Sequence, residues 1–160
     1  MTIFNFNKNS DLSNWYVVDD KVMGGVSAGS IRINEEGYAV FKGDVSLENN
    51  GGFSSVRYRF PKIELTDFTK VKIKLKGDGK NYQFRIKANS NDYYSYTFTF
   101  QTTNNWDIID IPLSSMYPVF RGRRLNMPNF NHSSVSEVTF LIANKRNEKF
   151  ELLIDSIELI

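Results

Sequence analysis

Apolar and polar residues alternate along most of this chain with a period of two residues, which is the period of a β-strand. The clearest run is Lys70–Lys76, in which Val71, Ile73 and Leu75 alternate with four lysines. Successive side chains of a strand point to opposite faces of a sheet, so this alternation predicts strands that are buried on one face only. We therefore expect a chain built almost entirely of β-strands.

The same alternation predicts strands at residues 15–19, 27–33, 38–45, 53–60, 70–76, 82–87, 94–101, 106–112, 138–143 and 150–160. A glycine-containing loop joins runs 70–76 and 82–87, so these two are predicted to form a hairpin. Short helical turns are expected only at 65–69 and 113–117, and residues 117–134 should form the longest irregular segment. Closely spaced strands favour one antiparallel β-sandwich, a jelly roll that covers residues 1–160 as a single domain.

Composition narrows the classes of function. Hydrophobic residues make up 41% of the 160 residues, charged residues make up 24%, and 13 Phe, eight Tyr and two Trp suit half-buried sheets. The chain has no cysteine, which excludes disulfides, thiolate metal sites and cysteine nucleophiles. A net charge of +2 is too small to point to nucleic acid. No apolar run could span a membrane and the first residues lack a signal-peptide core, so a cytoplasmic location is expected.

Two glycine pairs dominate the motifs. Neighbouring glycines allow tight turns and let another backbone or a ligand approach closely. We expect the two bends to pack beside each other at one rim of the sandwich and to form a docking patch. The candidate binding residues in and around these bends are Asp19, Asp20, Met23, Gly24, Gly25, Ser27, Asn49, Asn50, Gly51, Gly52, Phe53 and Arg57.

The adjacent carboxylates Asp19 and Asp20 invite an acid–base interpretation, but neighbours on a strand point to opposite faces and cannot act as a pair. A structural role is preferred: one is expected to be buried against Arg57 or Arg59, and the other to meet solvent or to cap the Met23-Gly24-Gly25 turn. An enzyme that uses one of these aspartates with Arg57 stays open as an alternative.

Basic residues form two further candidates. The lysines of Lys70–Lys76, together with Arg85 and Lys87, should share the outward face of the predicted hairpin. Such a face is either solvated or attracts an acidic protein, a phosphate or a membrane surface. Arg121 and Gly122 belong to an arginine-rich loop, and arginine forks suit carboxylate or phosphate recognition. The single histidine, His132, has no partner motif, and no spacing typical of a metal site or a phosphate-binding loop occurs.

Several stretches together resemble the complex I intermediate-associated protein 30 family, in order and over nearly the whole chain. The stretches are Asp19-Asp20-Lys-Val-Met-Gly-Gly-Val-Ser27, Phe41-Lys-Gly-Asp-Val-Ser46, Asn50-Gly-Gly-Phe-Ser-Ser-Val-Arg57, Lys76-Gly-Asp-Gly-Lys-Asn-Tyr82, Pro118-Val-Phe-Arg-Gly122 and Phe150-Glu-Leu-Leu-Ile-Asp-Ser-Ile157. The resemblance implies a galactose-binding-like jelly roll, similar to carbohydrate-binding modules. It also implies a chaperone-like assembly factor with no accepted catalytic activity and no cofactor.

Two functions remain as expectations. The first is a non-catalytic module that binds a protein partner through its glycine bends together with Arg121 and Gly122. The second is a carbohydrate-binding module whose polar sheet face carries two kinds of side chain, aromatic and hydrogen-bonding. The residues expected on that face are Tyr93, Thr97, Gln101 and Trp106. Neither function requires a metal ion.

Overall fold

The chain is described by a computed structural model that covers residues 1–21 and 24–160 in full and, for Val22 and Met23, the secondary structure alone. Strands dominate this described part, and the remaining regular elements are three short 3₁₀ turns, η1 to η3. In chain order the elements are β1 (Thr2–Asn5), β2 (Trp15–Asp19), η1 (Asp20–Met23), β3 (Ala28–Ile33), β4 (Ala39–Val45), η2 (Glu48–Asn50), β5 (Ser54–Glu64), β6 (Lys70–Lys76), β7 (Asn81–Lys87), β8 (Ser95–Gln101), β9 (Trp106–Pro112), η3 (Leu113–Ser115), β10 (Tyr117–Phe120), β11 (Arg123–Arg124), β12 (Ser134–Ile142) and β13 (Glu148–Leu159).

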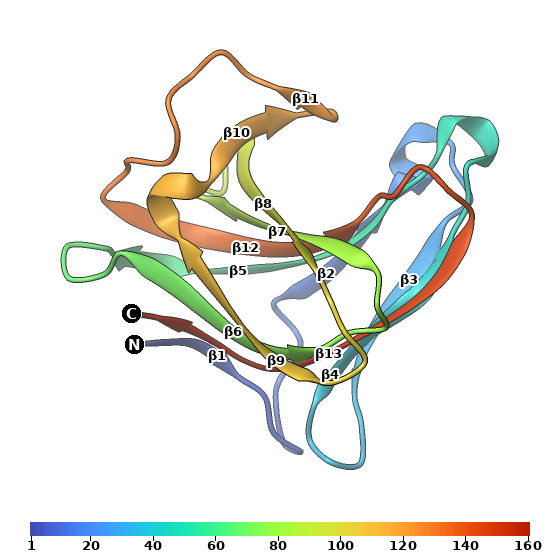
Figure 1. The fold of residues 1–160 in the computed structure, drawn as a ribbon, viewed down its shortest axis with the longest axis horizontal. Coiled ribbons are helices and arrows are strands. Elements are labelled where there is room, and N and C mark those ends of the chain that lie inside the picture. Colours follow the sequence, from blue (N-terminus) through green and yellow to red (C-terminus); the bar gives the residue numbers. More distant parts are fainter.

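The strands form two antiparallel sheets that face each other (Figure 1). Sheet A has the order β3-β4-β13-β6-β9, and β1 lies along the free stretch of the β13 edge beyond β4. Sheet B has the order β11-β10-β8-β7-β12-β5-β2. The predicted antiparallel β-sandwich is therefore confirmed. Its two chain ends lie side by side, because β1 and the end of β13 are neighbours.

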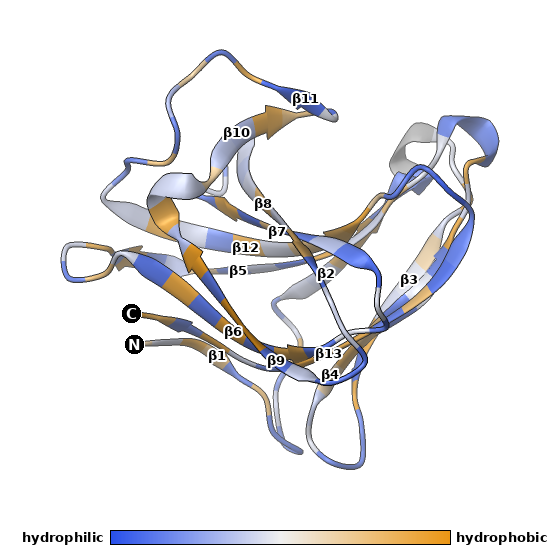
Figure 2. Ribbon diagram, viewed as in Figure 1, coloured by the Kyte–Doolittle hydropathy of each residue, from blue (hydrophilic) through white to orange (hydrophobic). Residues whose placement is uncertain are grey.

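The core lies between the sheets and follows the alternation of the sequence. On sheet A, Val71, Ile73 and Leu75 of β6 are almost fully buried, and alternating apolar and polar bands are visible along this strand in Figure 2. On sheet B, Phe84 of β7 packs against Phe140 of β12 with ring centroids 5.3 Å apart. Removing these side chains from water is the main force that holds the two sheets together.

The strand predictions largely agree with the structure, with three omissions, one late start and one early end, since β5 continues to Glu64 rather than ending at residue 60. The short strands β1, β10 and β11 were not predicted, and β10 and β11 lie inside the segment expected to be irregular. Strand β12 begins at Ser134 rather than at residue 138. The turn expected at 113–117 is present as η3, whereas residues 65–69 form a simple turn closed by the Phe68 amide, which donates to the Leu65 carbonyl.

The predicted hairpin between β6 and β7 is wrong. Strand β6 pairs with β13 and β9 in sheet A, whereas β7 pairs with β12 and β8 in sheet B. The glycine-containing loop between them is a crossover from one sheet to the other. As a consequence, the β6 lysines and the basic residues of β7 do not share one face but lie on opposite outer faces of the sandwich.

Strand β9 offers a matched test of the core. Ile111 is fully buried and Ile108, three residues earlier, is 49% exposed. We expect Ile111→Ala to lower the free energy of unfolding by about 2–5 kcal/mol, since it removes buried methyl groups and leaves a cavity. Ile108→Ala should change it by no more than about 0.5 kcal/mol. Urea unfolding followed by intrinsic fluorescence measures both, and equal losses would contradict the assignment of the two faces.

Candidate functional site

Both glycine bends lie where the chain crosses between the sheets. The first bend follows η1 and connects β2 of sheet B with β3 of sheet A, and the second follows η2 and connects β4 of sheet A with β5 of sheet B. The two connections stand together at one end of the sandwich (upper right in Figure 1). The structure therefore brings the two motifs into contact.

The carboxylate of Asp20, which is fully buried, joins the two bends. Its Oδ1 accepts a hydrogen bond from the Ser27 amide at 2.9 Å, and its Oδ2 accepts one from the Ser27 hydroxyl at 2.5 Å. The same Oδ2 accepts from the amide of Gly52 at 2.6 Å and from that of Phe53 at 3.3 Å. One carboxylate thus binds backbone from both crossovers.

At two of the motif glycines, Gly25 and Gly51, a larger side chain would collide with Asp20. A Cβ atom at Gly25 would lie 2.4 Å from the Asp20 Cγ, and one at Gly51 would lie 2.5 Å from its Oδ2. Neither distance is compatible with a side chain, so the glycines provide room for the carboxylate rather than for a ligand. Ser27 completes the arrangement, because its hydroxyl also accepts a hydrogen bond from the Ser46 amide at 2.9 Å.

The aspartate pair is structural in a way that differs from the prediction. Neither Arg57 nor Arg59 pairs with Asp20; hydrogen bonds from amides and a hydroxyl compensate its charge instead. Asp19 is the N-cap of η1 and accepts a hydrogen bond from the Lys21 amide at 3.4 Å. Burial raises the pKa of Asp20, but the hydrogen bonds from its partners outweigh burial and hold that pKa below its usual value.

The remaining motif residues differ in their exposure to solvent. Asn49 and Asn50 are exposed and both have positive φ, of 55° and 61°. Gly24 is exposed as well, and Phe53 is half-buried. The side chain of Met23 lies outside the described residues. The outer surface of the bends therefore offers amide groups at Asn49 and Asn50 together with the exposed apolar side chains of Val26 and Leu47, which are 45% and 43% exposed.

A second candidate site is the outer face of sheet B. One cross-strand row of this face, which we call the central row, runs over six neighbouring strands from β2 to β10. Its residues are directly opposite one another on neighbouring strands. On each strand they alternate with the buried core residues, so their side chains point to the outer face of the sheet. The central row consists of Tyr16, Arg57, Thr139, Arg85, Thr97 and Tyr117.

A row of charged residues lies beside the central row. Glu137 of β12 is almost completely buried, with 1% of its surface exposed. It forms ion pairs with Arg59 of β5 at 2.8 Å and with Lys87 of β7 at 3.8 Å. Lys87 also donates to the Asp92 carbonyl at 2.8 Å. Both cations of this second row are therefore held by oxygen atoms of the protein.

The arginines of the central row are much less well compensated. Burial lowers the pKa of Arg85 to about 10, and the nearby charge of Arg57 lowers it in the same direction. Burial also lowers the pKa of Arg57, which Glu137 partly restores. Arg85 donates from Nε and Nη2 to the Gln83 side-chain oxygen at 3.0 and 2.7 Å, a neutral acceptor. The buried Nε of Arg57 has no hydrogen-bond partner.

The predicted residues Arg121 and Gly122 form the turn between β10 and β11, with φ of 50° and 75°. This hairpin is the edge of sheet B opposite to β2, so these residues do not join the glycine bends. Instead the hairpin rises at one side of the outer face while the bends rise at the other (Figure 1). Its Arg124 lies over the Tyr117 ring, 4.4 Å from the centroid, at the end of the central row.

The face expected for carbohydrate is not assembled as predicted. Thr97 and Gln101 share the outer face of sheet B, because both have the outward parity of β8. Trp106 belongs to β9 in sheet A and packs against Tyr38 at 4.6 Å. Tyr93 is 63% exposed and contacts Phe120 edge-on at 5.1 Å. Trp106 therefore lies on the other sheet from Thr97 and Gln101, whereas Tyr93 lies against the β10–β11 hairpin that borders the outer face of sheet B.

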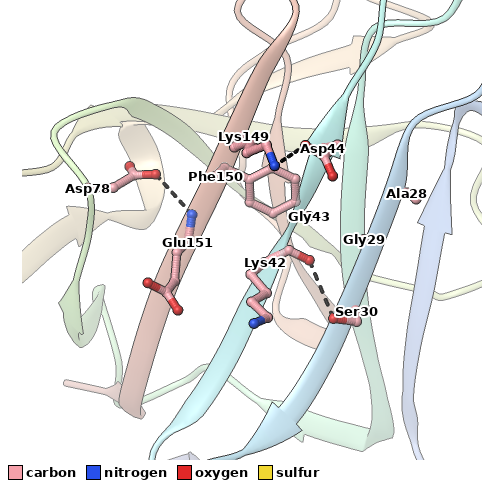
Figure 3. A pocket seen from close by; sticks show the side chains of 10 residues that line it. All are labelled: Ala28, Gly29, Ser30, Lys42, Gly43, Asp44, Asp78, Lys149, Phe150 and Glu151. Carbon is pink, nitrogen blue, oxygen red and sulfur yellow. Dashed lines mark hydrogen bonds and ion pairs between the residues drawn. The ribbon is translucent and has the colours of Figure 1, made fainter.

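A shallow hollow of about 590 Å³ lies on the outer face of sheet A (Figure 3). Three of its charged groups have partners nearby: Lys149 lies 4.0 Å from Asp44, and Asp78 accepts a hydrogen bond from the Glu151 amide at 2.9 Å. A Cβ at Gly43, on its floor, would lie 2.0 Å from the Ala28 carbonyl oxygen, so close strand packing explains this glycine. The hollow is a weaker candidate than the outer face of sheet B.

Within residues 1–21 and 24–160, no cluster of three or more histidine or acidic side chains is arranged to hold a metal ion. The same described part has no helix of the length and apolarity that a membrane crossing requires. His132 lies 2.9 Å from the Tyr96 hydroxyl through its Nε2 and packs against the rings of Tyr96 and Phe130, so its role in the structure is packing and hydrogen bonding.

The sequence profile of complex I intermediate-associated protein 30 matches residues 4–154 of the chain. The chain belongs to this family. The Asp20 arrangement thus describes how, in this member of the complex I intermediate-associated protein 30 family, the two glycine motifs are held together. No curated protein matches the chain.

Several carbohydrate-binding modules are among the solved structures similar to this family member. A family 11 module from Clostridium thermocellum, in complex with a β-1,3-1,4-mixed-linked tetrasaccharide, is 18% identical, with a TM-score of 0.70 over 98% of this chain and 94% of that chain. A family 11 module of a cellulosomal cellulase from the same organism is 17% identical, with a TM-score of 0.72 over 98% and 93%. A family 29 module is 7% identical, with a TM-score of 0.58 over 99% and 86%. At these identities the likeness establishes the jelly-roll fold alone.

The Asp20 carboxylate gives a pH-dependent prediction. Asp20→Asn should lower the free energy of unfolding by about 2–3 kcal/mol near pH 7, because it removes hydrogen bonds to a charged group. The folded-state pKa of Asp20 is depressed, so its contribution is complete above the unfolded pKa near 3.8 and is lost as pH falls through the folded value. The difference between wild type and variant should therefore shrink in acid.

Denaturant unfolding at pH 7 and at pH 3 measures this difference. Asp44→Asn is the matched control, since the Asp44 side chain is 64% exposed, and it should have little effect at either pH. If Asp20→Asn lowered the free energy of unfolding by the same amount at pH 3 as at pH 7, the role of the ionised carboxylate would be contradicted.

Proposed function

We propose that this chain is a non-catalytic binding module that docks an acidic surface of a protein partner on the outer face of sheet B. The observation that carries the proposal is the central row, a line of tyrosine, arginine and threonine side chains across six strands. The β10–β11 hairpin and the exposed part of the glycine bends border this face and contribute its rim.

The residue types of this face suit a protein interface. Tyrosine and arginine are enriched among the residues that dominate the binding energy of protein interfaces. Here both kinds are paired: the Arg59 guanidinium lies over Tyr16 at 5.8 Å, and that of Arg124 lies over Tyr117. Tyr16 is 45% exposed, so its ring is available to a partner.

The sign of the charge defines the partner. Arg57, Arg59, Arg85 and Lys87 supply four positive charges and Glu137 one negative charge, which leaves a formal excess of three positive charges. Complementary potentials accelerate encounter and select partners by charge. An acidic partner surface therefore fits this face, and the family, described as intermediate-associated, fits a protein ligand.

Carbohydrate binding is the second candidate function. Gln83 places an amide group on the same face, beside the almost fully buried hydroxyls of Thr97 and Thr139, and the fold is that of the carbohydrate-binding modules described above. The rings at both ends of the central row each have an arginine guanidinium over them, and the positive charge of these pairs suits an acidic protein surface better than a neutral sugar. The protein ligand is therefore preferred.

Charge reversal at exposed positions tests the docking face. The chain is immobilised and incubated with a lysate of its source cells, and the captured proteins are quantified by mass spectrometry. A double variant, Tyr16→Asp with Arg124→Glu, changes both ends of the central row and should reduce capture of an acidic partner by about tenfold or more.

The matched control makes the same change of charge on the opposite outer face, as Ile108→Asp with Lys42→Glu at two exposed positions of sheet A. Chemical denaturation of each variant verifies that it is folded. Capture that persists in the sheet B variant, or falls equally in both, would reject this face. A glycan array on which the wild type binds a neutral glycan, with the binding lost in the sheet B variant, would replace the protein partner by a carbohydrate.

A further inference from the structure

We propose that Arg57 and Arg85, with Thr139 between them, form a binding site for one oxyanion group of the ligand, a carboxylate or a phosphate. The inference rests on the proposed function, because it identifies the chemical group that would enter the centre of the same face. It concerns three residues of the central row rather than the face as a whole.

The register of the strands places the three side chains together. Thr139 of β12 is directly opposite Arg57 of β5 on one side and directly opposite Arg85 of β7 on the other. Neighbouring strands are about 4.8 Å apart, so the backbone positions of the two arginines are separated by about 10 Å. Two arginine side chains that leave the same face at this spacing can reach a single group above Thr139.

The two arginines of this site differ from the basic residues of the neighbouring row in the acceptors that they contact. Glu137, which is the only acidic residue of the two rows in the described part of the chain, contacts Arg59 and Lys87. Arg85 has the neutral Gln83 oxygen as its acceptor, and Arg57 Nε has no acceptor. Among the four basic residues of the two rows, Arg57, Arg59, Arg85 and Lys87, the two central arginines are therefore the ones without a carboxylate within ion-pair distance.

Leaving these groups without an anion is unfavourable. A buried polar group without a hydrogen bond and two like charges in a partly dehydrated place each destabilise the folded chain. A bound oxyanion removes both destabilising effects, because it accepts hydrogen bonds from the free N–H groups and its negative charge balances the two positive charges. Guanidinium groups suit this role, since their N–H donors match the two oxygens of a carboxylate or phosphate in parallel.

The competing explanation is that the arginines are there for stability. Their methylene stems do pack on the sheet, but a neutral side chain of the same length would do this without an unpartnered Nε. The deeper position of Arg57 and Arg85, compared with the exposed Arg121 and Arg123, favours a site over general surface charge.

The test uses the whole chain labelled with ¹⁵N and follows the arginine Nε–Hε signals by NMR. Sodium phosphate and sodium acetate are titrated separately, and sodium chloride at equal ionic strength is the reference. We expect saturable shifts of the Arg57 and Arg85 signals with at least one of the two oxyanions, and no saturable shift of Arg123. The oxyanion that binds more tightly identifies the phosphate or the carboxylate as the group recognised.

Two variants keep the charge and remove the fork. Arg57→Lys and Arg85→Lys should each weaken oxyanion binding by about tenfold or more, whereas Arg123→Lys should leave it unchanged. Thermal unfolding provides a second readout, because a ligand that binds only the folded chain raises the melting temperature. Phosphate or acetate should raise it above the chloride reference in the wild type and less in the two variants.

The results separate this inference from the docking proposal. Absence of saturable shifts at Arg57 and Arg85, or equal binding by the lysine variants, would overturn the oxyanion site even if partner capture still depended on Tyr16 and Arg124. Oxyanion binding at the two arginines in a chain whose partner capture ignores the sheet B variant would support the site and reject the docking face.

Discussion

A single buried carboxylate joins two of the connections that cross between the sheets, β2 to β3 and β4 to β5. Asp20 accepts hydrogen bonds from residues that follow the first crossover, from β2 to β3, and from residues that end the second, from β4 to β5. A buried charge is tolerated when it is surrounded by donors, and here amides and a hydroxyl provide them. The edges of the two sheets are held in place by this one group, and the glycines at Gly25 and Gly51 are a consequence of its size.

This constraint changes what the glycine motifs mean for function. A motif of glycine, asparagine and serine has the composition of a binding loop, yet its central polar atoms already bond to one another. What the bends offer to a partner is their outer rim. We therefore assign the proposed ligand-binding role to side chains without a carboxylate contact, Arg57 and Arg85 on the outer face of sheet B.

The alternation of the sequence was sufficient to predict most strands and which residues of each face the core, because parity is a local property. Pairing is not local, and this explains the error at β6 and β7: the loop between them has turn residues that suit a hairpin and a crossover equally. The strands β10 and β11 are too short to show alternation. Glu137 was overlooked because β12 starts before its apolar run.

The central row illustrates the same limit. Parity alone places Arg57 outward on β5 and Arg85 outward on β7, but the two are 28 positions apart and nothing local indicates that β12 brings them together. The sign that could have been read is chemical: arginine among the outward residues of interior strands, where threonine or serine would fill the space at lower cost in desolvation.

The free-energy cost of burying an arginine without an acceptor is informative about function. A fold whose only requirement was stability would lose little by exchanging a partly dehydrated, unpartnered arginine for a neutral residue, since replacing buried charge by well-packed neutral groups is often stabilising. The neighbouring row shows how the same sheet treats charge where it is structural: Glu137 is shared by two cations and nothing is left open. In the second row the cations have a carboxylate partner, whereas in the central row the arginines have none. This difference between two adjacent rows of one face is the reason to look for the missing anion outside the chain.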